Sequence, residues 1–116
     1  LEGLSQTTRK KLRQVLFNLI DNAAAHGDKV RVSVKGEAEA VLVCVDDNGV
    51  GIPEELYEEA FRPFSRLDAT RSRNQKGVGL GLAIARDVAR SHGGDIILSQ
   101  SPLGGLRATL RLPRPA

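Results

Sequence analysis

The stretch VLVCVDDNGVGIP at residues 41–53 decides the fold, because it joins an apolar strand to a loop with two glycines and a proline. The apolar run at residues 40–45 is continuous, which is typical of a central strand covered on both faces. Upstream, valines alternate with polar residues at 30–35, which predicts a half-buried strand. A short link at 36–38 joins the two strands, so we expect an antiparallel hairpin.

Helical patterns surround this hairpin. Residues 5–25 show apolar side chains at helical spacing, with Ser5 or Thr7 as a cap and Gly27 near the end. The expected apolar stripe comprises Leu12, Val15, Leu16, Leu19, Ile20 and Ala23. A short helix is predicted at 53–60. A second long helix is predicted at 80–91, with Leu82, Ile84, Ala85, Val88 and Ala89 facing inward.

Two further strands, at residues 96–98 and 106–112, complete the pattern. Helices and strands of this number favour an α+β domain, with one layer of helices on a mostly antiparallel sheet. The 116 residues suit a single domain. The single cysteine, Cys44, excludes an internal disulfide and a multi-cysteine zinc site. No apolar run reaches the roughly 20 residues that span a bilayer, and no signal peptide is recognisable.

The net charge of +3 raises the hypothesis of a nucleic-acid-binding module, but the charges are unevenly distributed. Residues 44–60 carry six acidic and no basic side chains, whereas 61–76 carry five basic side chains and one acidic. The basic residues are Arg62, Arg66, Arg71, Arg73 and Lys76. A basic loop that leads into a glycine-rich helix start favours a triphosphate ligand. A solvated run of charges is the alternative, and no aromatic platform accompanies the bases.

Two glycine-rich segments are candidates for ligand binding. Gly77, Gly79 and Gly81 open the second long helix, where free N–H groups and the helix dipole favour a phosphate. Their spacing matches neither the P-loop nor a Rossmann fingerprint. At residues 47–51 an aspartate follows the central strand and can accept a hydrogen bond from an exocyclic amine such as that of adenine. Glycines that only pack a helix, and an ordinary D-N-G turn, are the alternatives.

The first helix supplies a third element. Asn18, Asn22 and His26 are spaced by four and so form one row beside the apolar stripe. An amide oxygen suits Mg²⁺, which keeps several waters and takes phosphate oxygens as further ligands. A solvated helix edge, with His26 complementing the helix dipole, is the alternative explanation.

In this order, the segments resemble the catalytic ATP-binding domain of sensor histidine kinases, in the GHKL superfamily with its Bergerat fold. Four boxes carry the resemblance within a single domain at 1–116: the N box at 12–26, the first glycine box at 45–53, the F box at 61–64 and the second glycine box at 77–82. The resemblance implies a two-layer α/β sandwich, in which about three helices cover one face of a mixed, mostly antiparallel sheet. It also implies a long mobile ATP lid at about 62–78.

The resemblance implies ATP and Mg²⁺ as cofactors. Asn22 would be the Mg²⁺ ligand, and Asp47 would accept the adenine amine, with glycines beneath the base. His26 would lie near the adenine, whereas Ala25 stands where many relatives have a basic residue that contacts phosphate. The implied nucleotide-binding residues are Asn18, Asn22, His26, Asp47, Gly49, Gly51, Ile52, Arg66, Arg73, Lys76, Gly77, Val78, Gly79, Leu80 and Gly81.

Asn18 and Asn22 are the implied catalytic residues, and Asn18 separates the subfamilies. Related hydrolases, such as type II topoisomerases and heat-shock chaperones, have a glutamate there that activates water. An asparagine cannot take the proton, so ATP is kept intact until a protein nucleophile arrives. The implied activity is therefore that of a protein-histidine kinase in two-component signal transduction. A serine kinase of the anti-sigma-factor type and a GHKL ATPase are the alternatives.

The resemblance also implies partners outside this chain. Both histidines precede a glycine, as His26-Gly27 and His92-Gly93, and neither matches a phosphoacceptor. We therefore expect the γ-phosphate to pass to a histidine on a separate dimerisation domain of the same full-length protein, and then to a response regulator. No contact with nucleic acid or membrane is expected for this domain. The expected location is the cytoplasm, with the full-length protein anchored in the bacterial inner membrane.

Overall fold

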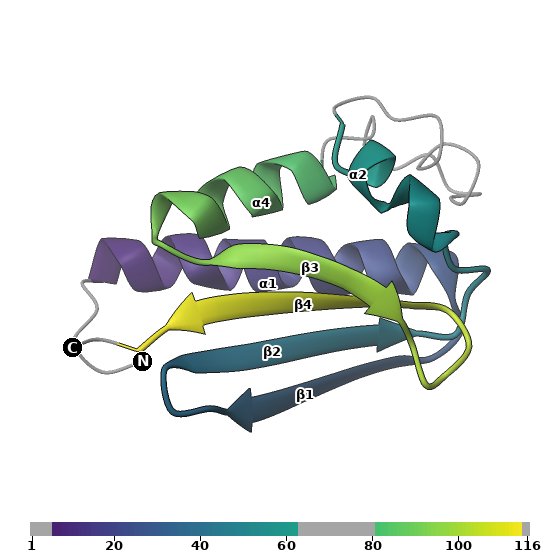
Figure 1. The fold of residues 1–116 in the computed structure, drawn as a ribbon, viewed down its shortest axis with the longest axis horizontal. Coiled ribbons are helices and arrows are strands. Elements are labelled where there is room, and N and C mark those ends of the chain that lie inside the picture. Colours follow the sequence, from purple (N-terminus) through teal and green to yellow (C-terminus); the bar gives the residue numbers. More distant parts are fainter. Residues whose placement is uncertain (1–5, 63–80, 115–116) are drawn as a thin grey trace.

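The computed structural model describes residues 6–62 and 81–114. Two long helices, a short helical segment and four strands make up this part of the chain (Figure 1). In chain order they are α1 (Gln6–His26), β1 (Val30–Gly36), β2 (Ala40–Asp47), a 3₁₀ turn (Glu54–Leu56), α2 (Tyr57–Ala60), α4 (Gly81–Ser91), β3 (Asp95–Gln100) and β4 (Leu106–Pro113).

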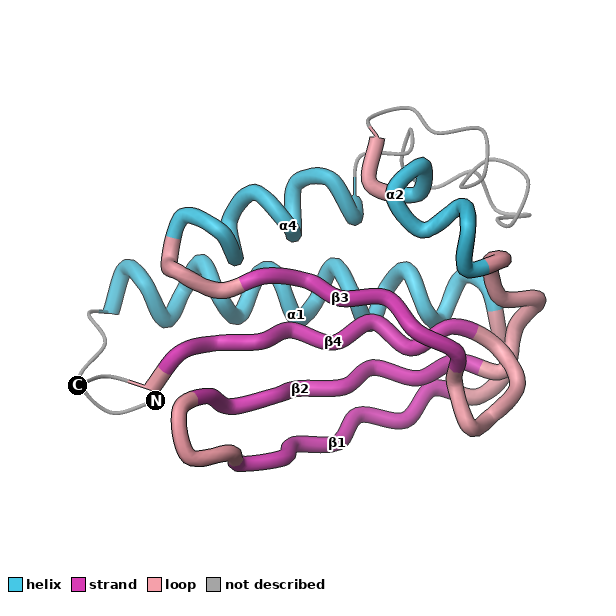
Figure 2. Tube along the Cα trace, viewed as in Figure 1, coloured by secondary structure: helices cyan, strands magenta, loops and turns pink. Residues whose placement is uncertain are grey.

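The four strands form one sheet in the order β1-β2-β4-β3, and each neighbouring pair is antiparallel (Figure 2). The predicted hairpin of β1 and β2 is present, with Val30 opposite Asp47. The strand predicted to end at residue 45 continues to Asp47, so both aspartates belong to β2. The helices lie on one face of this sheet. On its other face Ala40, Cys44 and Asp46 of the central strand β2 are buried as well, although no described helix covers them.

The core lies between the sheet and the pair α1 and α4, which run side by side. Leu19 of α1 is 1% exposed and Leu110 of β4 is 0% exposed, so both the helix layer and the sheet contribute fully buried side chains to this core. The predicted stripe of α1 faces the sheet: four of its members are buried, and Leu16 and Ile20 pack partly buried against the same cluster. Thr7 lies inside α1 and is not its cap.

Two predictions about buried side chains are wrong. Ile84 on α4 is 48% exposed, because it faces the groove between α1 and α4 rather than the sheet. Among the described strands β1 lies at the edge of the sheet and α1 covers it only near Val30, so Val32 and Val34 are exposed although they alternate as predicted.

The described chain begins and ends on the same side of the molecule. The start of α1 and the end of β4 lie together in Figure 1, whereas the end of α1, the end of β2 and the start of α4 lie toward the opposite side. Neither α1 nor any other described helix is long and apolar enough to cross a membrane.

Candidate functional site

The first glycine box lies against the end of α1 and against the loop that precedes β4. A side-chain carbon on Gly49 would collide with the carbonyl oxygen of His26, and one on Gly105 would collide with Asp47 Oδ1. Gly51 has a φ of 71° and lies next to Gly105. These close approaches require glycine and bring three segments together around one carboxylate.

That carboxylate belongs to Asp47, whose side chain is 1% exposed. Its Oδ1 accepts hydrogen bonds from the backbone N–H groups of Gly49 at 2.9 Å and Leu106 at 3.1 Å. Its backbone carbonyl oxygen accepts a further bond from the N–H of Gly105 at 3.1 Å. The donors come from both neighbouring segments, so the direction of the carboxylate is fixed by the backbone.

Gly105 is a residue of this site that the sequence analysis missed. The sequence predicts strands at 96–98 and 106–112 and assigns no functional role to the residues between them. The sequence does contain one indication, the two adjacent glycines at 104 and 105. Gly104 has a φ of 103°, so one glycine is enough for the turn and the second needs another reason. The second glycine is required by its contact with Asp47, which lies far away in the sequence.

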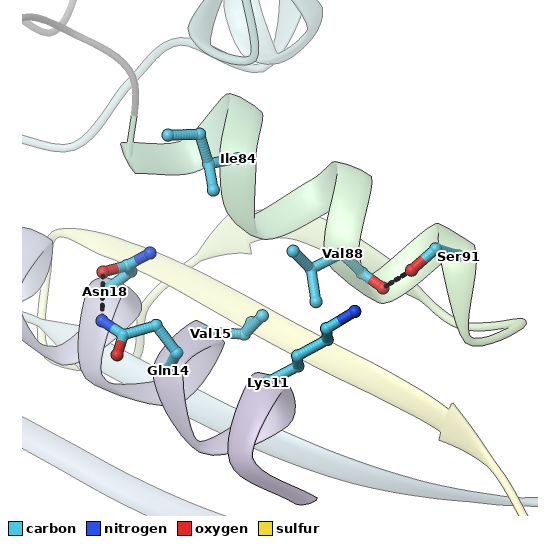
Figure 3. A pocket seen from close by; sticks show the side chains of 7 residues that line it. All are labelled: Lys11, Gln14, Val15, Asn18, Ile84, Val88 and Ser91. Carbon is cyan, nitrogen blue, oxygen red and sulfur yellow. Dashed lines mark hydrogen bonds between the residues drawn. The ribbon is translucent and has the colours of Figure 1, made fainter. Parts of the chain in front are cut away.

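The predicted row on α1 is helical over its full length, so Asn18, Asn22 and His26 share one side of the helix. Asn18 borders a groove of about 200 Å³ between α1 and α4 (Figure 3). Its Oδ1 accepts a hydrogen bond from Gln14 Nε2 at 3.5 Å. Figure 3 shows Lys11 on α1 and Ile84 on α4 at the two sides of the groove. Asn22 and His26 are half-buried, one and two turns closer to Gly49.

Asp46 forms a charged cluster on the opposite face of the sheet. It is fully buried, and its carboxylate pairs with Arg107 through Nε at 2.7 Å and Nη2 at 3.1 Å. Arg31 Nη2 lies 3.8 Å from Asp46 Oδ2. The hydrogen bonds to Asp46 raise the pKa of Arg107 above its ordinary value. The two hydrogen bonds between these side chains tie β2 to β4 next to Asp47.

A second charged cluster, which we call the Arg86 cluster, consists of Arg86, Glu58, Asp95 and Phe61. Arg86 donates two hydrogen bonds to Glu58, at 3.1 and 3.3 Å, and one to Asp95 at 3.2 Å. The hydrogen bonds and charge of Arg86 lower the pKa of Glu58. Burial by itself raises the pKa of Asp95, but hydrogen bonds from Arg90, the Ile96 N–H and Arg86 outweigh it, so that pKa is lowered too.

Several predicted site residues lie outside the described residues. They are Arg66, Arg73, Lys76, Gly77, Val78, Gly79 and Leu80, together with Phe64 of the F box. Gly81 is the first residue of α4, and Ile52, within the first glycine box, is buried in the core. The structure thus brings Asp47, Gly49 and Gly51 together near His26.

Comparison with known proteins defines the class. The chain belongs to the family of histidine kinase-, DNA gyrase B- and HSP90-like ATPases, which matches residues 7–116. The resemblance predicted from the four boxes is therefore confirmed.

Among its relatives, the chain is 46% identical over 103 residues to the sensor histidine kinase GtrS of Pseudomonas aeruginosa, covering 89% of this chain and 21% of that protein. It is 39% identical over 103 residues to the sensor histidine kinase CpxA of Escherichia coli, covering 88% of this chain and 22% of that protein. The chain thus spans about a fifth of the length of these curated relatives.

A solved structure with the same fold is the ATP binding domain of PrrB from Mycobacterium tuberculosis. It matches with a TM-score of 0.71 and 36% identity, covering 92% of this chain and 69% of that chain. The predicted α+β fold, with helices on one face of an antiparallel sheet, is confirmed by this match.

Proposed function

We propose that this chain binds Mg²⁺–ATP and donates the γ-phosphate to a histidine on a separate dimerisation domain, as the catalytic domain of a sensor histidine kinase. The observation that carries the proposal is the Asp47 carboxylate, held by two backbone N–H groups beside the glycine loop. A carboxylate can accept about four hydrogen bonds, so it can serve the backbone and an exocyclic amine together. The kinase relatives support the same function.

The residues present fit the two cofactors. A carboxylate with a fixed direction suits the amine edge of adenine, and Gly51 leaves the loop without a side chain where it turns. Asn22 offers an amide oxygen, and Mg²⁺ needs few protein ligands when phosphates and water supply the others. The cation, when bound, would neutralise phosphate charge, and Asn22 would hold it.

Asn18 separates transfer from hydrolysis in this proposal. Its amide cannot act as a general base, and the structure engages its oxygen with Gln14. We therefore propose slow hydrolysis of ATP by this chain and transfer to a supplied histidine. The partners we propose are a dimerisation domain of the longer protein and a response regulator. The proposed location is the cytoplasm, with the longer protein anchored in the inner membrane.

The binding step is tested by titration calorimetry with ATP and Mg²⁺. In Asp47→Asn the remaining amide oxygen can still accept the two N–H groups, but the new NH₂ group opposes the adenine amine. We expect the fold to persist in circular dichroism and ATP affinity to fall about tenfold or more. Unchanged affinity in this variant contradicts the proposed role of Asp47.

The transfer step is tested with ATP labelled at the γ-phosphate and a supplied dimerisation domain. Label should appear on that domain only when this chain is present, and Asn22→Ala should reduce it. Rapid release of inorganic phosphate by this chain alone would instead favour a GHKL ATPase.

A further inference from the structure

Two adjacent aspartates at the end of β2 are each held by one of two adjacent residues at the start of β4. Asp46 lies directly opposite Arg107 in the antiparallel register and forms two hydrogen bonds with its guanidinium. Asp47 Oδ1 accepts the backbone N–H of Leu106 at 3.1 Å. The two contacts therefore lie at adjacent positions on both strands.

The two aspartates face opposite sides of the sheet because successive side chains of a strand alternate. Val43 and Val45 belong to the core under the helices, so Asp47 lies on the helix-covered face. Asp46 lies on the other face with Cys44, although its side chain is 0% exposed. The Asp46–Arg107 ion pair on one face of the sheet thus lies directly behind the Asp47 carboxylate, which is proposed to bind adenine on the other face.

We infer that Arg107 is a positioning residue for Asp47, acting through Asp46. Its planar guanidinium grips both carboxylate oxygens, and such a bidentate pair fixes orientation as well as distance. This grip holds the end of β2 in register with the start of β4, so the Leu106 N–H stays on Asp47 Oδ1. The direction of the Asp47 carboxylate, and with it the selection of adenine, then depends on the pair. The inference rests on the proposed function and deepens it.

Arg31 contributes less to this arrangement. Its Nη2 lies 3.8 Å from Asp46 Oδ2 and its side chain is 53% exposed, whereas the Arg107 side chain is 31% exposed and lies 2.7 Å away. Arg31 is also on the edge strand β1, which carries no residue of the nucleotide site. The register that matters for Asp47 is that between β2 and β4, and of the two arginines Arg107 is the one on β4.

If the Asp46–Arg107 pair only stabilises the fold, its removal changes stability and leaves the preference for adenine unchanged. If the pair positions Asp47, its removal weakens that preference in a folded variant. Removing one partner leaves a buried charge without compensation and can unfold the domain. Replacing both partners by valine removes the pair without leaving a charge, and valine suits a strand. The double variant Asp46→Val/Arg107→Val therefore removes the grip while the sheet is kept.

The matched control is Cys44→Val/Thr109→Val. These two residues lie opposite each other on the same strands and the same face, two positions farther from Asp47, with Sγ and Oγ1 3.6 Å apart. The control changes the same kind of cross-strand polar contact without touching the proposed grip.

The experiment measures calorimetric affinities for ATP and for inosine triphosphate, which has a carbonyl oxygen in place of the adenine amine, both with Mg²⁺. We expect the unmodified chain and the control to prefer ATP about tenfold or more. In the double variant we expect the ratio to fall toward one. Arg107→Lys keeps the charge but loses the planar grip, so its ratio should fall several-fold.

A folded double variant that keeps the tenfold preference overturns the inference. If the double variant does not fold, a folded Arg107→Lys with an unchanged ratio overturns it equally. Failure of the proposed function is distinguishable: the unmodified chain then binds no ATP, or Asp47→Asn binds it unchanged, and the inference falls with it. Asp47-dependent ATP binding together with unaltered selectivity in the variants overturns the positioning role alone.

Discussion

The guanidinium carbon of Arg86 lies 4.0 Å from the centroid of the Phe61 ring. Phe61 directly precedes and Arg86 closely follows the segment that carries the predicted phosphate-contacting bases and glycines. The same guanidinium bonds Glu58 and Asp95, so one side chain joins the region of α2, α4 and the start of β3. The two ends of the intervening chain are thereby held at fixed positions on the core.

We expect Arg86→Met to lower the free energy of unfolding by about 1–2 kcal/mol at neutral pH, because it removes the ring contact and the bond to Asp95. Urea unfolding followed by circular dichroism measures this loss. Arg90→Met is the control, since Arg90 shares Asp95 but its side chain is 54% exposed. Equal losses in the two variants would contradict the central role of Arg86.

The Arg86 cluster also predicts a pH dependence. The pKa values of Glu58 and Asp95 are lower in the folded chain than their ordinary values. Their contribution is therefore complete above the pKa of the unfolded groups, roughly 4, and is lost as the pH falls through the folded pKa. We expect the stability difference between the unmodified chain and Arg86→Met to shrink between pH 6 and pH 3. If the free energies of unfolding of both proteins fell equally with pH, the proposed role of the Arg86 cluster in the pH dependence would be contradicted.

Gly105→Ala tests the contact between the loop before β4 and Asp47. The added carbon would collide with Asp47 Oδ1 and lie 2.6 Å from the Gly49 nitrogen. We expect a loss of stability of about 1–3 kcal/mol and at least a tenfold loss of ATP affinity by calorimetry. Gly104→Ala is the control, since nothing lies within 4 Å of its added carbon and only its φ of 103° is strained. That variant should lose stability and keep its affinity for ATP.

Leu110→Ala tests the core between sheet and helices. Leu110 is fully buried on β4, so truncation should cost about 2–5 kcal/mol in urea unfolding. Ile97→Ala on the neighbouring strand is the control, because Ile97 is 46% exposed and should change stability by about 0.5 kcal/mol or less. A comparable loss at both positions would mean that the open face of the sheet is covered in solution.

The sequence predicts those features that depend on neighbours along the chain. The C-terminal ends of α1 and α4, at His26 and Ser91, lie within one residue of the prediction, because helical periodicity is local. The sequence predicts that the strand ends at residue 45 and that Asp46 begins the following loop. The structure keeps it in β2 because Arg107, distant in sequence, compensates its charge.

The same limit applies to the other wrong predictions. Val32 and Val34 have the alternation of a half-buried strand, but their exposure is decided by the position of β1 at the edge of the sheet. The exposure of Ile84 depends on how α4 lies against α1. Gly49 and Gly51 were predicted from a local motif, whereas Gly105 could be recognised only once β4 was placed beside β2.

Because α1 begins and β4 ends on the same side of the molecule, both connections of this domain to a longer chain would lie close together. The start of α1 and the end of β4 lie on the side of the molecule opposite the end of β2, the strand that carries Asp47. Attachment to a longer protein at these two ends would therefore place both points of attachment away from Asp47.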